Sequence, residues 1–160
     1  MAGIGSAPAG QSATEPVSPA VPLDVLAIVF VGGAAGGLAR WGLAAVFPVH
    51  PGRFPWATFG TNVVGCLLIG VLMTLLLAHG NPHRLIRPFV GVGILGGFTT
   101  FSTFVVEADR LSSFGSTPLA LTYIASSIGT CLVAVWLGTA ATRRLAHIDH
   151  EPIETVGEWS

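Results

Sequence analysis

The residues best suited to chemistry in this chain form the run from Gly96 to Phe104, GGFTTFSTF. The run lies inside an apolar stretch long enough to cross a membrane. Adjacent glycines have excess backbone freedom and adjacent threonines are stiff at their first rotamer, so the run predicts a broken helix. A break at membrane depth is tolerated only inside protein or beside a polar cavity. In transporters such breaks often mark the ion site.

Phe101 and Phe104 stand three residues apart within this run and share a helix face, which Phe98 extends. An aromatic ring has an electropositive edge, so it can face a naked anion where a carboxylate would repel it. The neighbouring threonine and serine hydroxyls supply uncharged hydrogen-bond donors. The run therefore fits a small anion, with ordinary packing or interface placement of the rings as the competing interpretation.

A second polar face comes from Thr58, Thr61 and Asn62, spaced i, i+3 and i+4 along another apolar stretch. An amide in hydrocarbon needs partners, so Asn62 is expected to face the helix bundle or a water path. The alternative is that Asn62 only joins two helices by hydrogen bonds.

A third polar stripe comes from Tyr123, Ser127 and Thr130, at i, i+4 and i+7, with Ser126 alongside. Because a hydroxyl in a membrane helix often bonds its own backbone, a single such residue would carry little weight. The stripe as a whole either lines a path or bonds its own helix, and the residues alone leave both open.

Charged residues are few and lie toward the ends of the apolar stretches. Arg40 ends the first one, where a buried charge costs about 2.5–3.5 kcal/mol unless it snorkels, so it lies either in an anion-concentrating vestibule or at the interface. Glu107 and Asp109 are expected to pair with Arg110 or another arginine at the membrane interface. No carboxylate lies near the middle of a stretch, which argues against a proton-coupled carrier.

The composition indicates a membrane protein, because only 9% of the 160 residues are charged, against about 25% in soluble domains. The mean hydropathy is +0.73, and a net charge of −1 gives no support to a nucleic-acid partner. Cys66 and Cys131 both fall in apolar segments and are expected to be small packing residues. Four stretches reach the length of about 20 residues that a span needs: Leu23–Phe47, Trp56–Ala78, Leu85–Val106 and Pro118–Thr142.

The predicted fold class is therefore an all-α integral membrane protein with four transmembrane helices, the third of them broken. Residues 1–22 are predicted to be a disordered tail, 23–145 the transmembrane domain and 146–160 a polar C-terminal tail. Short connections make neighbouring spans antiparallel and place both termini on one side. The arginine bias that orients membrane proteins is weak, with Arg84, Arg87, Arg143 and Arg144 on that side and Arg53 and Arg110 on the other.

These motifs resemble the CrcB/Fluc family of bacterial fluoride channels over residues 25–140. Residues 32–40 (GGAAGGLAR) are similar to the family's first-span glycine motif, and residues 58–65 (TFGTNVVG) to its second-span motif around an asparagine. The run 96–104 followed by Glu107 is similar to the family's most specific signature, and Tyr123 and Ser127 match its fourth-span polar track. Three positions depart from the common pattern: Ala57, Thr61, and Cys131 with Thr130 beside it. The last leaves open which residue lines the far end of the track.

The resemblance implies a dual-topology homodimer, in which two copies inserted in opposite orientations form two antiparallel pores. It implies that the backbone carbonyls of Gly96 and Thr99 from both copies hold one structural Na⁺ at the dimer interface. It further implies a fluoride pathway in which Phe101 and Phe104 offer ring edges and Asn62 donates from the wall. Tyr123, Ser127, Thr58 and Thr130 would continue this pathway, and Arg40 would lie near an entrance.

The function implied is passive export of cytoplasmic fluoride through the inner (plasma) membrane, which protects the cell from fluoride, without enzymatic activity. Its partners would be fluoride, the lipid bilayer and the inverted second copy. Two alternatives are a small four-span multidrug or cation transporter and an assembly subunit of a membrane complex. The first would want a carboxylate embedded in its first span, where this chain has none.

Overall fold

The computed structural model describes residues 22–78 and 83–146, and all regular structure in these ranges is helical. The elements are α1 (Leu23–Val46), α2 (Trp56–Ala78), η1 (Arg87–Leu95), α3 (Gly96–Phe98), α4 (Ser102–Ser113) and α5 (Thr117–Leu145). Four spans are long and apolar enough to cross a membrane, and η1, α3 and α4 together form the third, Arg87–Ser113. The predicted four-span, all-helical fold is confirmed. The predicted tails, 1–22 and 146–160, lie outside the described residues except at positions 22 and 146.

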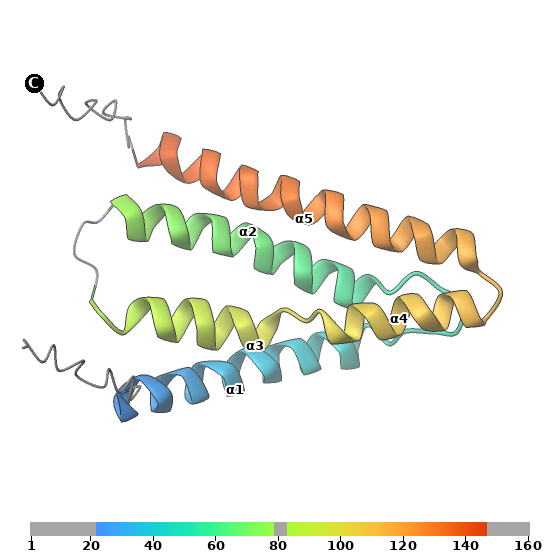
Figure 1. Cartoon of the computed structure of the whole chain (residues 1–160), viewed down its shortest axis with the longest axis horizontal. Coiled ribbons are helices and arrows are strands. Elements are labelled where there is room, and N and C mark those ends of the chain that lie inside the picture. Colours follow the sequence, from blue (N-terminus) through green and yellow to red (C-terminus); the bar gives the residue numbers. More distant parts are fainter. Residues whose placement is uncertain (1–21, 79–82, 147–160) are drawn as a thin grey trace, which may run out of the picture.

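The third span is broken where the Gly-Gly and Thr-Thr pairs predicted it (Figure 1). Helix α3 ends at Phe98, Thr99 takes an extended conformation with ψ 158°, and α4 begins at Ser102. The preceding nine residues, η1, form a π-helix, a rare and wider coil. The uniform apolarity of this segment carries no signal that distinguishes a π-helix from an α-helix.

Glycines bring the helices together in two pairs, α2 with α5 and α1 with η1 and α3, as Figure 1 shows. A β-carbon on Gly36 would overlap the Ile94 carbonyl, and one on Gly138 would overlap the Leu67 carbonyl. Such backbone-to-backbone approach stabilises helix pairs in lipid, where apolar contact alone does not favour association. The glycine-rich segment of the first span is thus a packing surface against the broken span.

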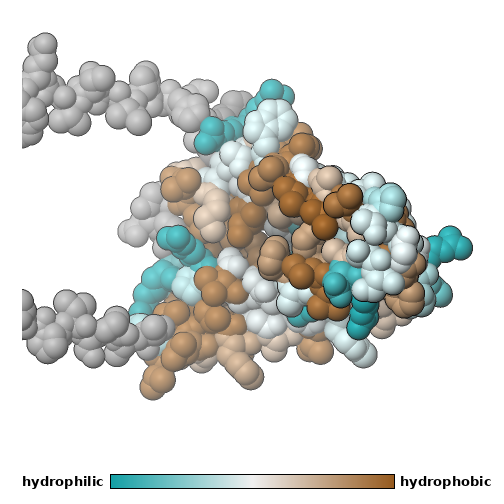
Figure 2. All heavy atoms as spheres, turned by 45° about the vertical axis from the view of Figure 1, so that its right-hand side comes forward, coloured by the Kyte–Doolittle hydropathy of each residue, from teal (hydrophilic) through white to brown (hydrophobic). Residues whose placement is uncertain are grey.

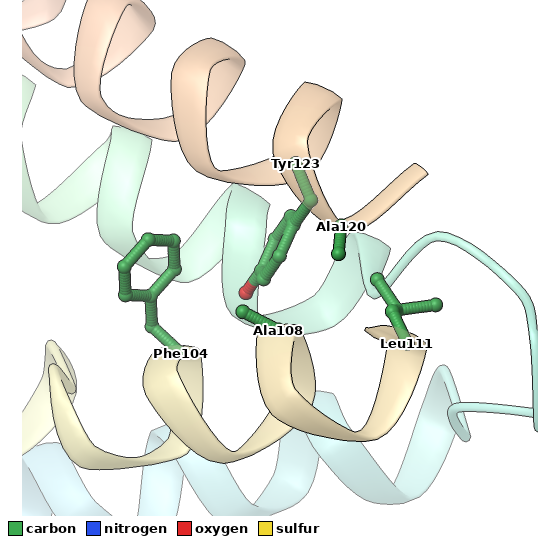
Figure 3. Packing of buried hydrophobic residues seen from close by; sticks show 5 residues of the cluster. All are labelled: Phe104, Ala108, Leu111, Ala120 and Tyr123. Carbon is green, nitrogen blue, oxygen red and sulfur yellow. The ribbon is translucent and has the colours of Figure 1, made fainter. Parts of the chain in front are cut away.

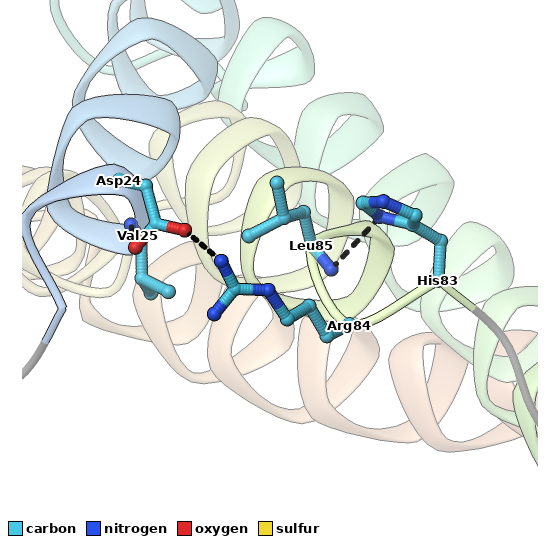
Figure 4. A network of polar contacts seen from close by, with 5 residues as sticks. All are labelled: Asp24, Val25, His83, Arg84 and Leu85. Carbon is cyan, nitrogen blue, oxygen red and sulfur yellow. Dashed lines mark hydrogen bonds and ion pairs between the residues drawn. The ribbon is translucent and has the colours of Figure 1, made fainter.

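Neighbouring spans run antiparallel, as predicted. The α1–α2 and α4–α5 connections lie at one end of the bundle, and the start of α1 and the end of α5 lie at the other (Figure 1). At that second end Arg84 forms an ion pair with Asp24 of α1, and the Leu85 N–H donates to the His83 ring (Figure 4). Apolar side chains cover much of the face seen in Figure 2, and hydrophilic ones gather mainly toward the ends, as expected for a lipid-facing surface.

Candidate functional site

The break in the third span is stabilised by the side-chain amide of Asn62. Its Nδ2 donates to the Thr100 carbonyl at 3.0 Å, and its Oδ1 accepts from the Thr100 N–H at 2.9 Å. This pair of bonds is the one that a backbone strand would make, so Asn62 replaces the helix partners that Thr100 has lost. Asn62 thus faces the bundle, one of its two predicted placements, and its partner is the broken backbone itself. The same bonds join two spans, so the alternative of a helix-joining amide also stays open.

Arg40 also binds the broken span, from the α1 side. Its Nε donates to the Gly97 carbonyl at 3.1 Å, and its side chain is half-buried. A guanidinium has five N–H donors, and this bond to a neutral carbonyl uses one of them. The positive charge of Arg40 is therefore not neutralised by this contact. Arg40 lines a cavity of about 310 Å³ together with Thr58, Thr100, Thr103 and Glu107. We call this cavity the vestibule, and both predicted placements of Arg40, in an anion-concentrating vestibule or at the membrane interface, stay predictions.

Two carbonyls at the break lose their usual helical donors. In a continuous α-helix the Thr100 N–H would reach the Gly96 carbonyl, but here it binds Asn62. Likewise the Thr103 N–H would reach the Thr99 carbonyl, but it donates to the Thr100 hydroxyl at 3.2 Å. The carbonyls of Gly96 and Thr99 are thus two of those that lose their helical donors at the break.

Glu107 accepts two hydrogen bonds inside the protein, one on each carboxylate oxygen. The Thr58 hydroxyl donates to Oε1 and the Tyr123 hydroxyl donates to Oε2, both at 2.9 Å. Glu107 is 8% exposed and Tyr123 is fully buried, with its hydroxyl pointing at α4 (Figure 3). The predicted pairing of Glu107 with Arg110 is wrong: within 83–146 the structure shows no ion pair between them, because α4 turns Glu107 inward toward α2 and α5.

The aromatic residues form a continuous series beside this carboxylate. The rings of Phe101 and Phe104 lie 5.9 Å apart between centroids, and those of Phe104 and Tyr123 lie 5.1 Å apart. Phe104 is 8% exposed, whereas Phe101 is 78% exposed in the single chain. Phe54 at the start of α2 packs edge-on against Tyr123 with a centroid distance of 5.2 Å. Hydropathy alone did not identify Phe54, because its place depends on how α2 meets α5.

A cavity of about 470 Å³ joins Phe101 and Phe104 to the break and to the α5 stripe. The neutral hydrogen-bonding residues Asn62, Thr100 and Ser127 line it, and within the described chain no charged side chain does. The Ser127 hydroxyl is buried, and among the described residues it is the buried side-chain oxygen without a hydrogen-bond partner. A buried hydroxyl normally has a hydrogen-bond partner, so Ser127 offers a polar group to whatever occupies the cavity.

The predicted site residues therefore divide into two neighbouring cavities that share Thr100. Arg40 and Thr58 line the vestibule, whereas Asn62, Phe101, Phe104, Ser127, Gly96 and Thr99 line the larger cavity. Tyr123 supports the site from behind through Glu107. Of the polar residues and cysteine on α5, Ser127 and Cys131 line the larger cavity, and Thr130 is half-buried outside that lining. Cys66 and Cys131, which the sequence predicted only as packing residues, also line this cavity, and this shared position depends on the level of α2 relative to α5.

The chain is similar in sequence to known proteins. The family model described as "CrcB-like protein, Camphor Resistance (CrcB)" matches residues 27–139. The chain is 46% identical over 121 residues to a Streptomyces coelicolor protein named "Fluoride-specific ion channel FluC 1", an alignment that covers 76% of this chain and 79% of that protein.

Two further relatives carry a similar name, "Fluoride-specific ion channel FluC 2". The one from Nocardia farcinica is 47% identical over 133 residues, covering 83% of this chain and 94% of its own length. The one from Thermobifida fusca is 49% identical over 121 residues, covering 76% and 90%. The match spans all four membrane helices and both cavities, and the chain therefore belongs to the CrcB family.

Proposed function

We propose that this chain is a fluoride-selective channel that lets cytoplasmic fluoride leave a bacterial cell passively across the plasma membrane. The relatives that it matches over most of their length are named for that activity. The structural observation that carries the proposal is the larger cavity, which phenylalanine rings and neutral polar residues line without a fixed charge. A pore must bind an ion well enough to dehydrate it and weakly enough to release it, and uncharged donors meet that compromise.

The residues suggest an order of contacts along the path. Arg40 raises the local concentration of anions in the vestibule without lying in the larger cavity. Thr100 borders both cavities, so an anion that moves from one to the other passes this residue. The ring edges of Phe101 and Phe104 then face the anion, and the unpartnered Ser127 hydroxyl offers the next donor. This path requires neither ATP nor a proton relay.

The working unit that we propose is an antiparallel pair of copies. Phe101 is 78% exposed in the single chain although it lines the cavity, so a second copy would complete the wall and cover this ring. Arginines occur at both ends of the bundle, which weakens the preference for one orientation. The pairing rests on these two observations together with the family resemblance.

We further propose that the freed carbonyls of Gly96 and Thr99 hold a structural Na⁺ where the two copies meet. Both residues line the open cavity, and the donors that would normally occupy their carbonyls are bound elsewhere. Backbone carbonyls suit hard cations such as Na⁺. The ion's contribution would be to hold the two broken spans together rather than to take part in conduction.

The test of the proposed function is anion efflux from liposomes that contain the purified protein. Vesicles loaded with fluoride should empty, whereas vesicles loaded with chloride should retain their anion. A multidrug or cation transporter would instead move a cation in exchange for protons, and a passive assembly subunit would leave both anions inside. Equal retention of fluoride and chloride would contradict the proposal.

A further inference from the structure

The two cysteines of the chain face each other across the pair of helices that lines the larger cavity. Cys66 lies on α2 and Cys131 on α5, both are half-buried, and both line the cavity. Neither cysteine is in a disulfide. We propose that Cys66 and Cys131 together form a site for a soft dication that accepts two thiolates, of which Hg²⁺ is the type.

The register of α2 and α5 brings the thiols to one level. The hydroxyls of Thr58 and Tyr123 meet on the Glu107 carboxylate, and Cys66 and Cys131 each follow these residues by eight positions along their helices. One turn further on, Gly70 packs directly against the backbone at Val135. The cysteine pair is therefore held between two fixed contacts of the same parallel helix pair.

A second observation is a hydroxyl group without a hydrogen-bond partner in the same part of the cavity. Ser127 lies one turn before Cys131 on α5, and its buried hydroxyl has no hydrogen-bond partner among the described residues. A serine oxygen is a weak ligand for a soft cation, but it can accept or donate a hydrogen bond to water or an anion beside the metal. The cavity thus offers two soft ligands and one free hydroxyl at adjacent turns.

The chemistry of the pair selects the cation. Thiolates prefer soft metals, and binding releases the thiol protons. Each S–H bond breaks, each sulfur forms one bond to Hg²⁺, and two protons pass to water, so the complex is neutral overall. A neutral complex avoids the cost of burying a net charge. Zn²⁺ would want four ligands, and the described residues show no cluster of three or more histidines, cysteines or carboxylates.

The bound cation would lie in the lining of the larger cavity, beside Ser127 and on the same surface as Phe104. It would occupy space and donors that a passing anion needs, so occupancy should block conduction. This consequence rests on the proposed fluoride function, whereas metal binding itself does not. The two parts can therefore fail separately.

The test uses the full-length protein, whose two cysteines are its only ones. Parent, Cys66→Ser, Cys131→Ser and the double variant are incubated with Hg²⁺ and passed through a desalting column with excess monothiol. Bound mercury is then measured per chain. We expect about one Hg²⁺ per parent chain, at least ten-fold less on each single variant, and none on the double variant, because two tethered thiols outcompete separate ones.

Three results would overturn the site or its placement. Equal retention by the single variants and the parent would show that the cysteines do not act together. One Hg²⁺ per two chains on either single variant would place the bridge between copies rather than within one.

In liposomes, Hg²⁺ should lower fluoride efflux of the parent at least ten-fold, reversibly with a dithiol, and leave the double variant at its own untreated rate. Unchanged parent efflux with mercury bound would contradict the position in the pathway, whereas absent efflux without mercury would contradict only the fluoride function.

Discussion

The side chain of Asn62 satisfies both backbone groups of Thr100, at 3.0 Å from its carbonyl and 2.9 Å from its N–H. One amide on α2 thereby satisfies the residue at which the third span breaks. A break in lipid otherwise leaves groups that cost several kcal/mol each. Because the Thr100 N–H is engaged with Asn62, the Gly96 carbonyl loses its helical donor. Asn62 also lines the larger cavity.

Replacing Asn62 with aspartate should damage both stability and conduction. A carboxylate can still accept from the Thr100 N–H, but it places a second acceptor against the Thr100 carbonyl. Leaving that carbonyl unpaired costs about 1–3 kcal/mol, so we expect a lower melting temperature in detergent and strongly reduced fluoride efflux. Ser126→Ala is a suitable control, since Ser126 bonds only its own helix backbone. An Asn62→Asp protein that melts and conducts like the parent would contradict this role.

The phenylalanines of the cavity should be needed for flux and not for folding. Phe101→Ile and Phe104→Ile remove the electropositive ring edges while keeping apolar volume. Fluoride efflux should therefore fall at least ten-fold, while the protein should still purify intact. Phe30→Ile on α1 is a matched control, because Phe30 is 77% exposed and Phe101 is 78% exposed, yet Phe30 lies outside the cavity lining. The pore role would be refuted by normal flux in both cavity variants.

The hydrogen bond between Tyr123 and Glu107 should be measurable as a coupling energy. Tyr123→Phe removes the hydroxyl that donates to Glu107 Oε2 at 2.9 Å. A buried carboxylate oxygen is then left without this hydrogen bond, which should lower the free energy of unfolding by about 1–3 kcal/mol. In a double-mutant cycle with Glu107→Gln, the effects on stability should be non-additive. Asp109→Asn, an exposed carboxylate on the same helix, should leave stability within about 0.5 kcal/mol. Additive effects of Tyr123→Phe and Glu107→Gln would show that the bond contributes nothing.

The first span should tolerate a methyl group at one glycine and not at its neighbour. A β-carbon on Gly36 would overlap the Ile94 carbonyl, whereas one on Gly37 would meet nothing within 4 Å. Gly36→Ala should therefore push α1 away from the broken span and cost about 1–3 kcal/mol. Gly37→Ala should leave the melting temperature unchanged or raise it, because alanine is the better helix former. Similar melting temperatures for the two variants would argue against this close packing.

The sequence predicted what depends on neighbouring residues and missed what depends on the register between spans. The break at Thr99 was predictable from adjacent glycines and threonines, and the need of Asn62 for a partner followed from the cost of a bare amide in lipid. The backbone of Thr100 as that partner was not predictable, because it requires the relative heights of α2 and the third span.

For Glu107 the sequence predicted a wrong partner, again because the relative placement of the helices was not known. Arg110 is its nearest basic residue along the chain, so an ion pair was the natural prediction, but the rotation of α4 directs Glu107 to Thr58 and Tyr123. The cysteine pair was likewise invisible until α2 and α5 were aligned. A uniformly apolar sequence predicts which segments span the membrane, but it does not predict which side chains of different spans contact each other.

The central claim is tested most directly by fluoride efflux from proteoliposomes, followed with a fluoride electrode and with potassium ionophore added to balance charge. We predict rapid release only when the ionophore is present, at a rate that does not follow a proton gradient, because a passive channel carries uncompensated charge. Fluoride that stays inside the vesicles after the charge has been balanced would contradict the account.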